Sequence, residues 1–135
     1  MKLIDTNVVI YAMGSQHPYK DICRRALSLV FEQKVEANID VETLQEIAHF
    51  YHRRNRLDFG LSLFDRLLLL FPSPLPITHE LAVVMRELLA RYPHLQARDA
   101  IHAAVVLQHG LEGIISADRG FDAVPEISRF DPKDL

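Results

Sequence analysis

The sequence predicts a single α/β domain spanning residues 1–135, with a central parallel β-sheet flanked by α-helices. Short apolar segments rich in β-branched residues alternate with amphipathic helical patterns along the whole chain. Three of these segments are closely followed by an acid, namely Asp5, Asp40 and Asp118. In open α/β sheets, ligands bind at the carboxyl ends of the strands, where helix N-termini converge. The repeated acid therefore predicts a functional site at that edge.

The first junction is the most informative one. Lys2–Ile4 is expected to form a short buried strand, which runs into Asp5-Thr6-Asn7 before apolar residues resume. A purely structural interpretation, in which Asp5 only caps a following helix, is open at this point because Asp and Asn are preferred caps.

Helical and strand patterns alternate through the remainder of the chain. Helices are expected at 17–34, 41–52, 58–71, 79–92 and 100–108, with Asp40, Asp58, Thr78 and Asp99 at the starts of the last four, and strands at 35–39, 75–77, 113–116 and 127–130. Cys23 and the leucines at 67–70 are expected in the core. Parallel strands joined by right-handed crossovers place their carboxyl ends on one edge, so Asp5 and Asp118 meet if their strands are neighbours.

Composition narrows the class of protein. Hydrophobic residues make up 49% and charged residues 24% of the chain, which is typical of an ordinary soluble domain. The formal net charge is −3, so any nucleic-acid binding must depend on local basic clusters or metal ions. An acid at position 5 interrupts any secretory signal, and no apolar run is long enough for a membrane span. A single cysteine suits a reducing compartment, and we expect a cytoplasmic protein.

Four carboxylates are predicted to converge at the strand edge. Asp99 and Glu46 belong to helices that start at or near the edge where Asp5 and Asp118 lie. Such a cluster repels itself unless a divalent cation neutralises it. Ligation by oxygen atoms alone favours Mg²⁺ or Mn²⁺ over Zn²⁺, and the usual partner of such a site is a phosphate group.

These residues also carry a resemblance to a known family. The segments Leu3-Ile4-Asp5-Thr6-Asn7, Thr43-Leu44-Gln45-Glu46-Ile47, Arg98-Asp99-Ala100-Ile101-His102 and Ser116-Ala117-Asp118-Arg119-Gly120-Phe121 resemble the four acidic motifs of the PIN domain, in order and over essentially the full chain. More narrowly, the chain resembles VapC-type toxins of toxin–antitoxin pairs.

The resemblance implies RNA cleavage dependent on Mg²⁺ or Mn²⁺, products with 5′-phosphate and 3′-hydroxyl ends, a homodimer and a VapB-like antitoxin. It assigns Asp5, Glu46, Asp99 and Asp118 to the metal site, and Asn7 and Ser116 to polar positions beside it. Two positions depart from the pattern: Asp40 stands where many members have Ser, and Ser116 where Thr is more common. Asp40 is expected to add negative charge near the site, and the place of Asp122 is open.

The other chemically suggestive residues have simpler interpretations. Arg53, Arg54 and Arg56 are candidates for RNA backbone contacts, although a charged helix end is often merely solvated. His102 is expected to serve packing or capping, because no histidine shows metal-ligand spacing.

Three other functions compete with that of a toxin nuclease. A haloacid-dehalogenase-type phosphatase requires an Asp where Asn7 stands. A catalytically silent PIN-fold regulatory subunit and a housekeeping PIN nuclease without an antitoxin stay open.

Overall fold

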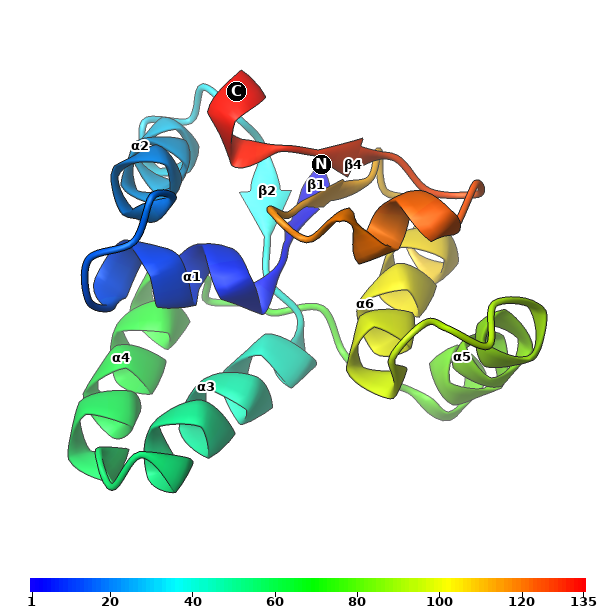
Figure 1. The fold of residues 1–135 in the computed structure, drawn as a ribbon, viewed down its shortest axis with the longest axis horizontal. Helices are drawn as coiled ribbons and strands as arrows, with labels where there is room; N and C mark the ends of the chain where they lie inside the picture. The colour runs from blue at the N-terminus through cyan, green and yellow to red at the C-terminus, as the bar shows by residue number, and fades with distance from the viewer.

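A computed structural model describes all residues, 1–135, as a parallel four-stranded sheet surrounded by helices (Figure 1). The strands are β1 (Lys2–Ile4), β2 (Ala37–Asn38), β3 (Ile114–Ile115) and β4 (Arg129–Phe130). The α-helices are α1 (Thr6–Met13), α2 (Lys20–Phe31), α3 (Val41–Arg53), α4 (Leu57–Leu70), α5 (His79–Arg91) and α6 (Ala97–Gln108), and two 3₁₀ helices are η1 (Arg119–Ala123) and η2 (Pro132–Asp134). The strand order β2-β1-β3-β4 makes β1 and β3 neighbours, which is the condition under which Asp5 and Asp118 were expected to meet.

The two faces of the sheet bury different cores, because successive strand residues point to opposite sides. Ile4 and its β3 partner Ile115 pack with α1, α2, α3 and α4, whereas Leu3 and its partner Ile114 pack with α5 and α6. Figure 1 shows the corresponding division, with α3 and α4 on one side of the molecule and α5 and α6 on the other. β1 therefore holds both halves together.

The chain differs from the predicted elements mainly at their boundaries. The strands are shorter than expected, and the segment predicted at 75–77 forms only an isolated bridge between Leu75 and Asp40. The prediction that leucines 67–70 are all core is wrong, because four consecutive helical residues cannot face one side. Leu67 is buried, but Leu69 is 83% exposed and its neighbours Leu68 and Leu70 are exposed as well. Cys23 is buried as expected.

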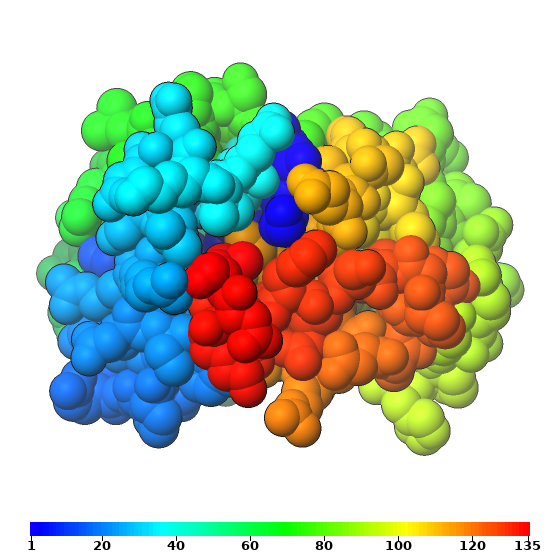
Figure 2. All heavy atoms as spheres, turned by 90° about the horizontal axis from the view of Figure 1, so that it is seen from above, coloured from blue at the N-terminus to red at the C-terminus, as the bar shows by residue number.

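The C-terminal segment covers one end of the molecule. Figure 2 shows this segment, in red, crossing the surface beside α2 and η1. There β4 pairs with β3 in parallel, with Ile114 opposite Arg129. The final residues thereby cover the outer edge of β3, which leads into the acid-bearing loop at 116–118. None of the helices combines the length and apolarity that crossing a membrane would require.

Candidate active site

The N-terminal ends of three helices converge beside the carboxyl ends of β1 and β3 (Figure 1). Asp5 is the N-cap residue of α1, Asp99 lies in the first turn of α6, and Glu46 lies further along α3. Asp118 follows β3 and is the N-cap of η1, where its side chain accepts a hydrogen bond from the Gly120 amide at 2.8 Å. The positive ends of the helix dipoles face this region and favour negative charge there.

Asp5 does not serve as an ordinary helix cap. Its side chain forms no capping hydrogen bond, although it is only 5% exposed. Instead, the hydroxyl of the fully buried Ser116 donates to Asp5 Oδ2 at 2.6 Å. The Ser116 oxygen in turn accepts from the Asp118 amide at 2.9 Å. Ser116 thus fixes the carboxylate of Asp5 and the backbone before Asp118 at the same time.

Asn7 adds a polar group on the same side. Its amide nitrogen donates to Ser116 Oγ at 3.4 Å, while its Oδ1 atom is buried and has no hydrogen-bond partner in the protein. An oxygen without a partner is costly in a buried position. This orphaned oxygen, beside several carboxylates, suits a hard cation or a water held by one.

The acids sense one another electrostatically. Burial raises the pKa of Asp5, and the charges of Glu46 and Asp118 raise it further, while His102 and Ser116 oppose the shift. Burial, followed by the charges of Asp5 and Asp118, raises the pKa of Asp99 to about 6. The cluster therefore favours proton uptake when no cation is present.

His102 makes buried contacts to the acids that the sequence did not predict. It is fully buried, with Nδ1 2.6 Å from Asp40 Oδ2 and Nε2 2.9 Å from Glu46 Oε1. Burial alone would lower the pKa of His102, but the hydrogen bonds and charges of these partners raise it well above its ordinary value. The imidazolium therefore donates to both carboxylates, and Nε2 also lies 3.8 Å from Asp5 Oδ1. The expectation of mere packing or capping is wrong.

Asp40 is likewise not an unpaired extra charge. It is fully buried, and its Oδ1 accepts hydrogen bonds from the Thr43 amide at 2.9 Å and the Thr43 hydroxyl at 3.2 Å. Its other oxygen accepts from His102. Asp40 therefore caps α3 and holds the imidazolium that positions Glu46, which explains an acid at this position.

Asp122 lies outside this cluster. It forms a two-pronged ion pair with Arg129, whose Nε and Nη2 atoms are 2.8 Å and 3.2 Å from its carboxylate. Arg129 Nη1 also donates to the backbone oxygen of Ser116 at 2.9 Å and lies 3.4 Å from Asp131. Arg129 belongs to β4, so these contacts attach the residues on both sides of Asp118 to that strand.

The basic segment lies elsewhere. Arg53 ends α3, and Arg54 and Arg56 follow it, at the opposite end of this helix from Asp40. All three side chains are exposed. The structure therefore does not bring them to the acids, and RNA contacts by all three stay a prediction.

Oxygen ligands for a divalent cation are present, but the side chains do not form a finished ligand set. No three His, Cys, Asp or Glu side chains converge in a way that would hold a metal ion. Glu46 is engaged by His102, and Asp5 by Ser116. The mutual elevation of the carboxyl pKa values and the orphaned Asn7 oxygen nonetheless fit a cation with oxygen ligands.

The raised pKa of Asp99 leads to a pH prediction for the protein in chelator. Well below pH 3.8, this carboxyl is protonated in the folded and unfolded chain alike, so it has no effect on stability. Between there and about pH 6 the unfolded chain loses the proton first, so the free energy of unfolding falls as pH rises, and the loss persists above pH 6. Asp99→Asn removes this contribution.

The difference in unfolding free energy, Asp99→Asn minus wild type, is therefore expected to increase from pH 4 to about 6.5 in EDTA. Urea titrations at a series of pH values measure it. Asp65→Asn on exposed α4, whose carboxyl lies away from the cluster, is the control. A difference that does not change with pH would contradict the electrostatic description.

Comparisons with known proteins agree with this geometry. The PIN domain family model matches residues 2–127. VapC ribonuclease Mb1869c of Mycobacterium bovis and ribonuclease VapC13 of Mycobacterium tuberculosis are each 36% identical over 129 residues, covering 96% of this chain and 98% of their own. Among solved structures, FitAcB from Neisseria gonorrhoeae superposes with a TM-score of 0.77 at 23% identity, with both chains fully covered. A toxin–antitoxin complex from Klebsiella pneumoniae gives 0.70 at 19% identity.

The fold and the acidic strand edge thus define a PIN domain. The chain belongs to the PIN-domain family and, within it, to the VapC ribonucleases.

Proposed function

We propose that this chain is a ribonuclease dependent on Mg²⁺ or Mn²⁺ and the toxin of a VapBC-type toxin–antitoxin pair. The observation that carries the proposal is the cluster of Asp5, Asp99 and Asp118. Their charges raise the pKa values of Asp5 and Asp99, and the cluster lies beside the unpartnered oxygen of Asn7. Membership of the VapC ribonucleases supports RNA as the substrate.

The proposed metal-site residues are Asp5, Glu46, Asp99 and Asp118. When bound, the cation supplies Lewis-acid activation of the attacking water and stabilisation of charge on the phosphate. Ser116 orients Asp5 by its 2.6 Å hydrogen bond, and the imidazolium of His102 holds Glu46 at 2.9 Å. These contacts restrict the orientations of the Asp5 and Glu46 carboxylates before a cation and an RNA phosphodiester bind.

The direct test is cleavage of a mixed RNA pool by the purified chain. Cleavage is expected with Mg²⁺ or Mn²⁺ and not in chelator, with 5′-phosphate and 3′-hydroxyl ends on the products. A chain that cleaves no RNA with either cation would be the silent regulatory subunit instead.

Cation binding should also increase the free energy of unfolding. A cation that binds only the folded state at a hundredfold excess over its dissociation constant adds about 2.7 kcal/mol. Mn²⁺ is therefore expected to raise the melting temperature by several degrees, and by much less in Asp99→Asn or Asp118→Asn. Glu80→Gln on exposed α5 is the control and should keep the full rise. Equal rises in all variants would place the cation elsewhere.

An antitoxin is the proposed protein partner, and exposed apolar residues where α2 and α4 end support one. Leu70 of α4 and Phe31 of α2 are both exposed and line one small pocket together with Phe71. We assign this apolar pocket to a VapB-like segment, with an Arg side chain of the antitoxin reaching the acidic cluster and competing with the cation. A second copy of the chain, giving a homodimer, is the other proposed partner. Light scattering of the purified chain measures its molar mass and so tests for the dimer.

Growth separates a toxin from a housekeeping nuclease. Expression of the chain alone is expected to arrest growth, and co-expression of an adjacent antitoxin gene is expected to restore it. Added antitoxin should suppress cleavage in vitro, and less so when its inserted Arg is changed to Ala. A chain that is harmless at high expression would refute the toxin assignment but not the nuclease.

A further inference from the structure

A cavity of about 640 Å³ lies at the far ends of two helices whose beginnings contribute to the acidic site. It is bounded by the C-terminal end of α1 with the residues that follow, and by the C-terminal end of α3 with the start of α4. Although the chain has a net charge of −3, no Asp or Glu lines this cavity. Its lining includes Tyr11, His17, Phe50, Tyr51, Arg54 and Arg56.

One wall of the cavity is a preformed aromatic surface. The rings of Tyr11 and His17 stack with their centroids 4.1 Å apart and their planes at 11°. His17 is exposed and Tyr11 is half-buried. A flat ring pair that is already ordered offers a stacking surface at small entropic cost.

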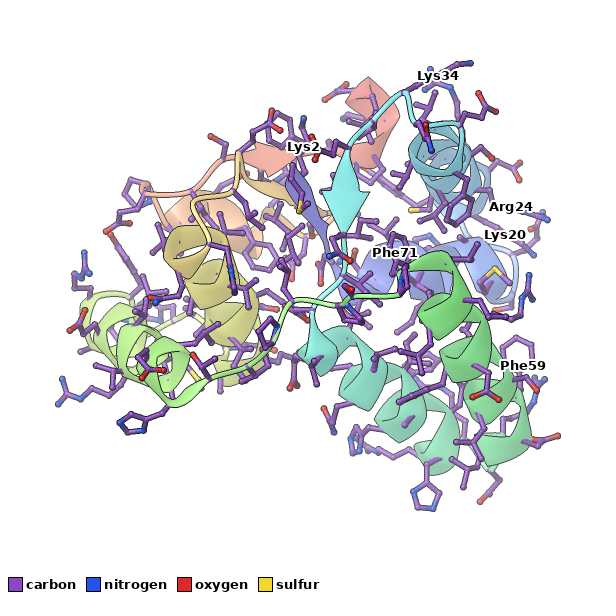
Figure 3. All side chains as sticks on the ribbon, turned by 180° about the vertical axis from the view of Figure 1, so that it is seen from behind. Lys2, Lys20, Arg24, Lys34, Phe59 and Phe71 are labelled. Carbon is purple, nitrogen blue, oxygen red and sulfur yellow. The ribbon has the colours of Figure 1, made fainter.

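The cationic side chains of the cavity are also held in place. The Arg54 guanidinium lies 3.5 Å from the centroid of the Phe50 ring, and its Nη1 atom donates to the Phe50 backbone oxygen at 3.1 Å. Arg56 lies 4.8 Å from the ring centroid of Phe59, a residue at the start of α4 (Figure 3). Both arginines are exposed, and neither forms an ion pair with an acid, so their remaining donors are available to an anion such as phosphate.

Tyr51 provides the observation that points most directly to a ligand. Its residue is only 5% exposed, and its hydroxyl is buried without a hydrogen-bond partner in the protein. Burial raises the pKa of this phenol, so it remains a hydrogen-bond donor at neutral pH. Since an unpartnered buried hydroxyl costs stability, a phenylalanine would serve a purely structural role better.

We propose that this cavity binds one unpaired nucleotide of single-stranded RNA. The base stacks on the Tyr11–His17 pair, the phosphate lies against Arg54 and Arg56, and the Tyr51 hydroxyl bonds to the base edge or the ribose. Stacking combined with fixed cations is how proteins bind single strands. The assignment rests on the proposed ribonuclease function.

The position of the cavity suits such a strand. Tyr11 lies on the helix that Asp5 begins, about 9 Å further along its axis. Tyr51 lies on the helix that carries Glu46, about 7.5 Å further along its axis. A strand held in the cavity therefore extends along α1 and α3 towards the acidic cluster, so that the bound nucleotide serves to position a neighbouring phosphodiester.

The sharpest test is Tyr51→Phe, which removes only the hydroxyl. Fluorescence anisotropy with an end-labelled, mixed-sequence single-stranded RNA, in the cleavage-deficient Asp5→Asn background, measures affinity. Tyr51→Phe is expected to weaken RNA binding about 3- to 10-fold without lowering the melting temperature. His17→Ala, on the exposed ring of the pair, is expected to weaken it about fivefold or more. Unchanged affinity in both variants would overturn the proposal.

Charge is tested separately by the salt dependence of binding. Arg54→Gln is expected to reduce the slope of log affinity against log salt by about 0.7, the value for one phosphate contact on a single strand. Arg24→Gln, an exposed arginine on α2 (Figure 3), is the matched control and should leave the slope unchanged. Equal changes of the slope in both variants would mean that Arg54 attracts RNA only as a general positive charge, and would overturn the proposed subsite.

The cleavage assay distinguishes failure of this subsite from failure of the nuclease proposal. A wild-type chain that cleaves RNA while Tyr51→Phe and His17→Ala retain full affinity leaves the nuclease intact and removes only the subsite. A wild-type chain that neither binds nor cleaves RNA refutes both. If Tyr51→Phe weakens the binding of an antitoxin peptide but not of RNA, the cavity is a protein-docking site and the RNA assignment is wrong.

Discussion

Asp5→Asn is expected to reduce RNA cleavage by more than about 100-fold, because residues that merely orient metal ligands already cost 10- to 100-fold when replaced. The fold should remain intact, since Asn keeps the shape of the side chain and can still accept a hydrogen bond from Ser116. In chelator the variant should be more stable than wild type at neutral pH. The reason is that burial raises the pKa of Asp5, so its ionised form opposes folding.

Activity and stability are thus expected to change in opposite directions. Product release from labelled RNA with Mn²⁺ measures the first, and thermal unfolding in EDTA measures the second. Glu42→Gln, on the first turn of α3, is a control for removing one acid near the cluster. Full cleavage by Asp5→Asn would refute the assignment of Asp5, whereas equal losses of activity and stability would indicate a folding defect.

Asp40→Ala is expected to be the most destabilising single substitution in the acidic cluster, by about 3–5 kcal/mol. Its removal leaves the buried imidazolium of His102 without its 2.6 Å partner, and breaking one side of a buried ion pair has a cost of that size. Loss of the Thr43 cap adds to it, at about 1 kcal/mol. Urea unfolding measures the change.

The capping and charge contributions can be separated. Thr78→Ala removes a comparable cap, because the Thr78 side chain accepts from the Leu81 amide, and it should cost only about 1 kcal/mol. Asp40→Ser retains a capping oxygen without the charge and should fall between the two. Adding His102→Leu to Asp40→Ala should recover part of the loss, because both partners are then absent. A cost for Asp40→Ala no larger than that for Thr78→Ala would contradict the ion pair.

Local sequence patterns predicted the framework of the site well. The β1 strand, the alternation of strands with helices and the common edge for the carboxyl ends of parallel strands follow from short-range hydrophobic patterns and the chirality of crossovers, whereas the pairing of β1 with β3 comes from the structure. They place Asp5 and Asp118 at one edge without any knowledge of side-chain contacts. The assignments of ligand roles to these acids remain proposals.

The contacts of His102 were not predictable in this way. Its partners Asp40 and Glu46 lie 62 and 56 residues earlier in the chain, so no local spacing identifies them. One signal was available: a buried acid requires a cationic partner, and His102 lies on an alanine-rich helix that was expected to pack closely against the sheet. The prediction that leucines 67–70 are all core failed for a local reason. Their apolar composition suggested a core, but the helical period turns three of the four to solvent.

The contacts of Arg129 with Asp122 and Ser116 predict the outcome of a genetic selection. This residue joins Asp122 to the backbone of Ser116, and so fixes the loop that carries Asp118 without itself being one of the acids. A selection for survivors of toxin expression is therefore expected to return substitutions at position 129 together with those of the acids. Such survivors would carry a complete set of carboxylates and still be inactive, so a map of mutations that abolish toxicity will be larger than the map of residues that touch RNA.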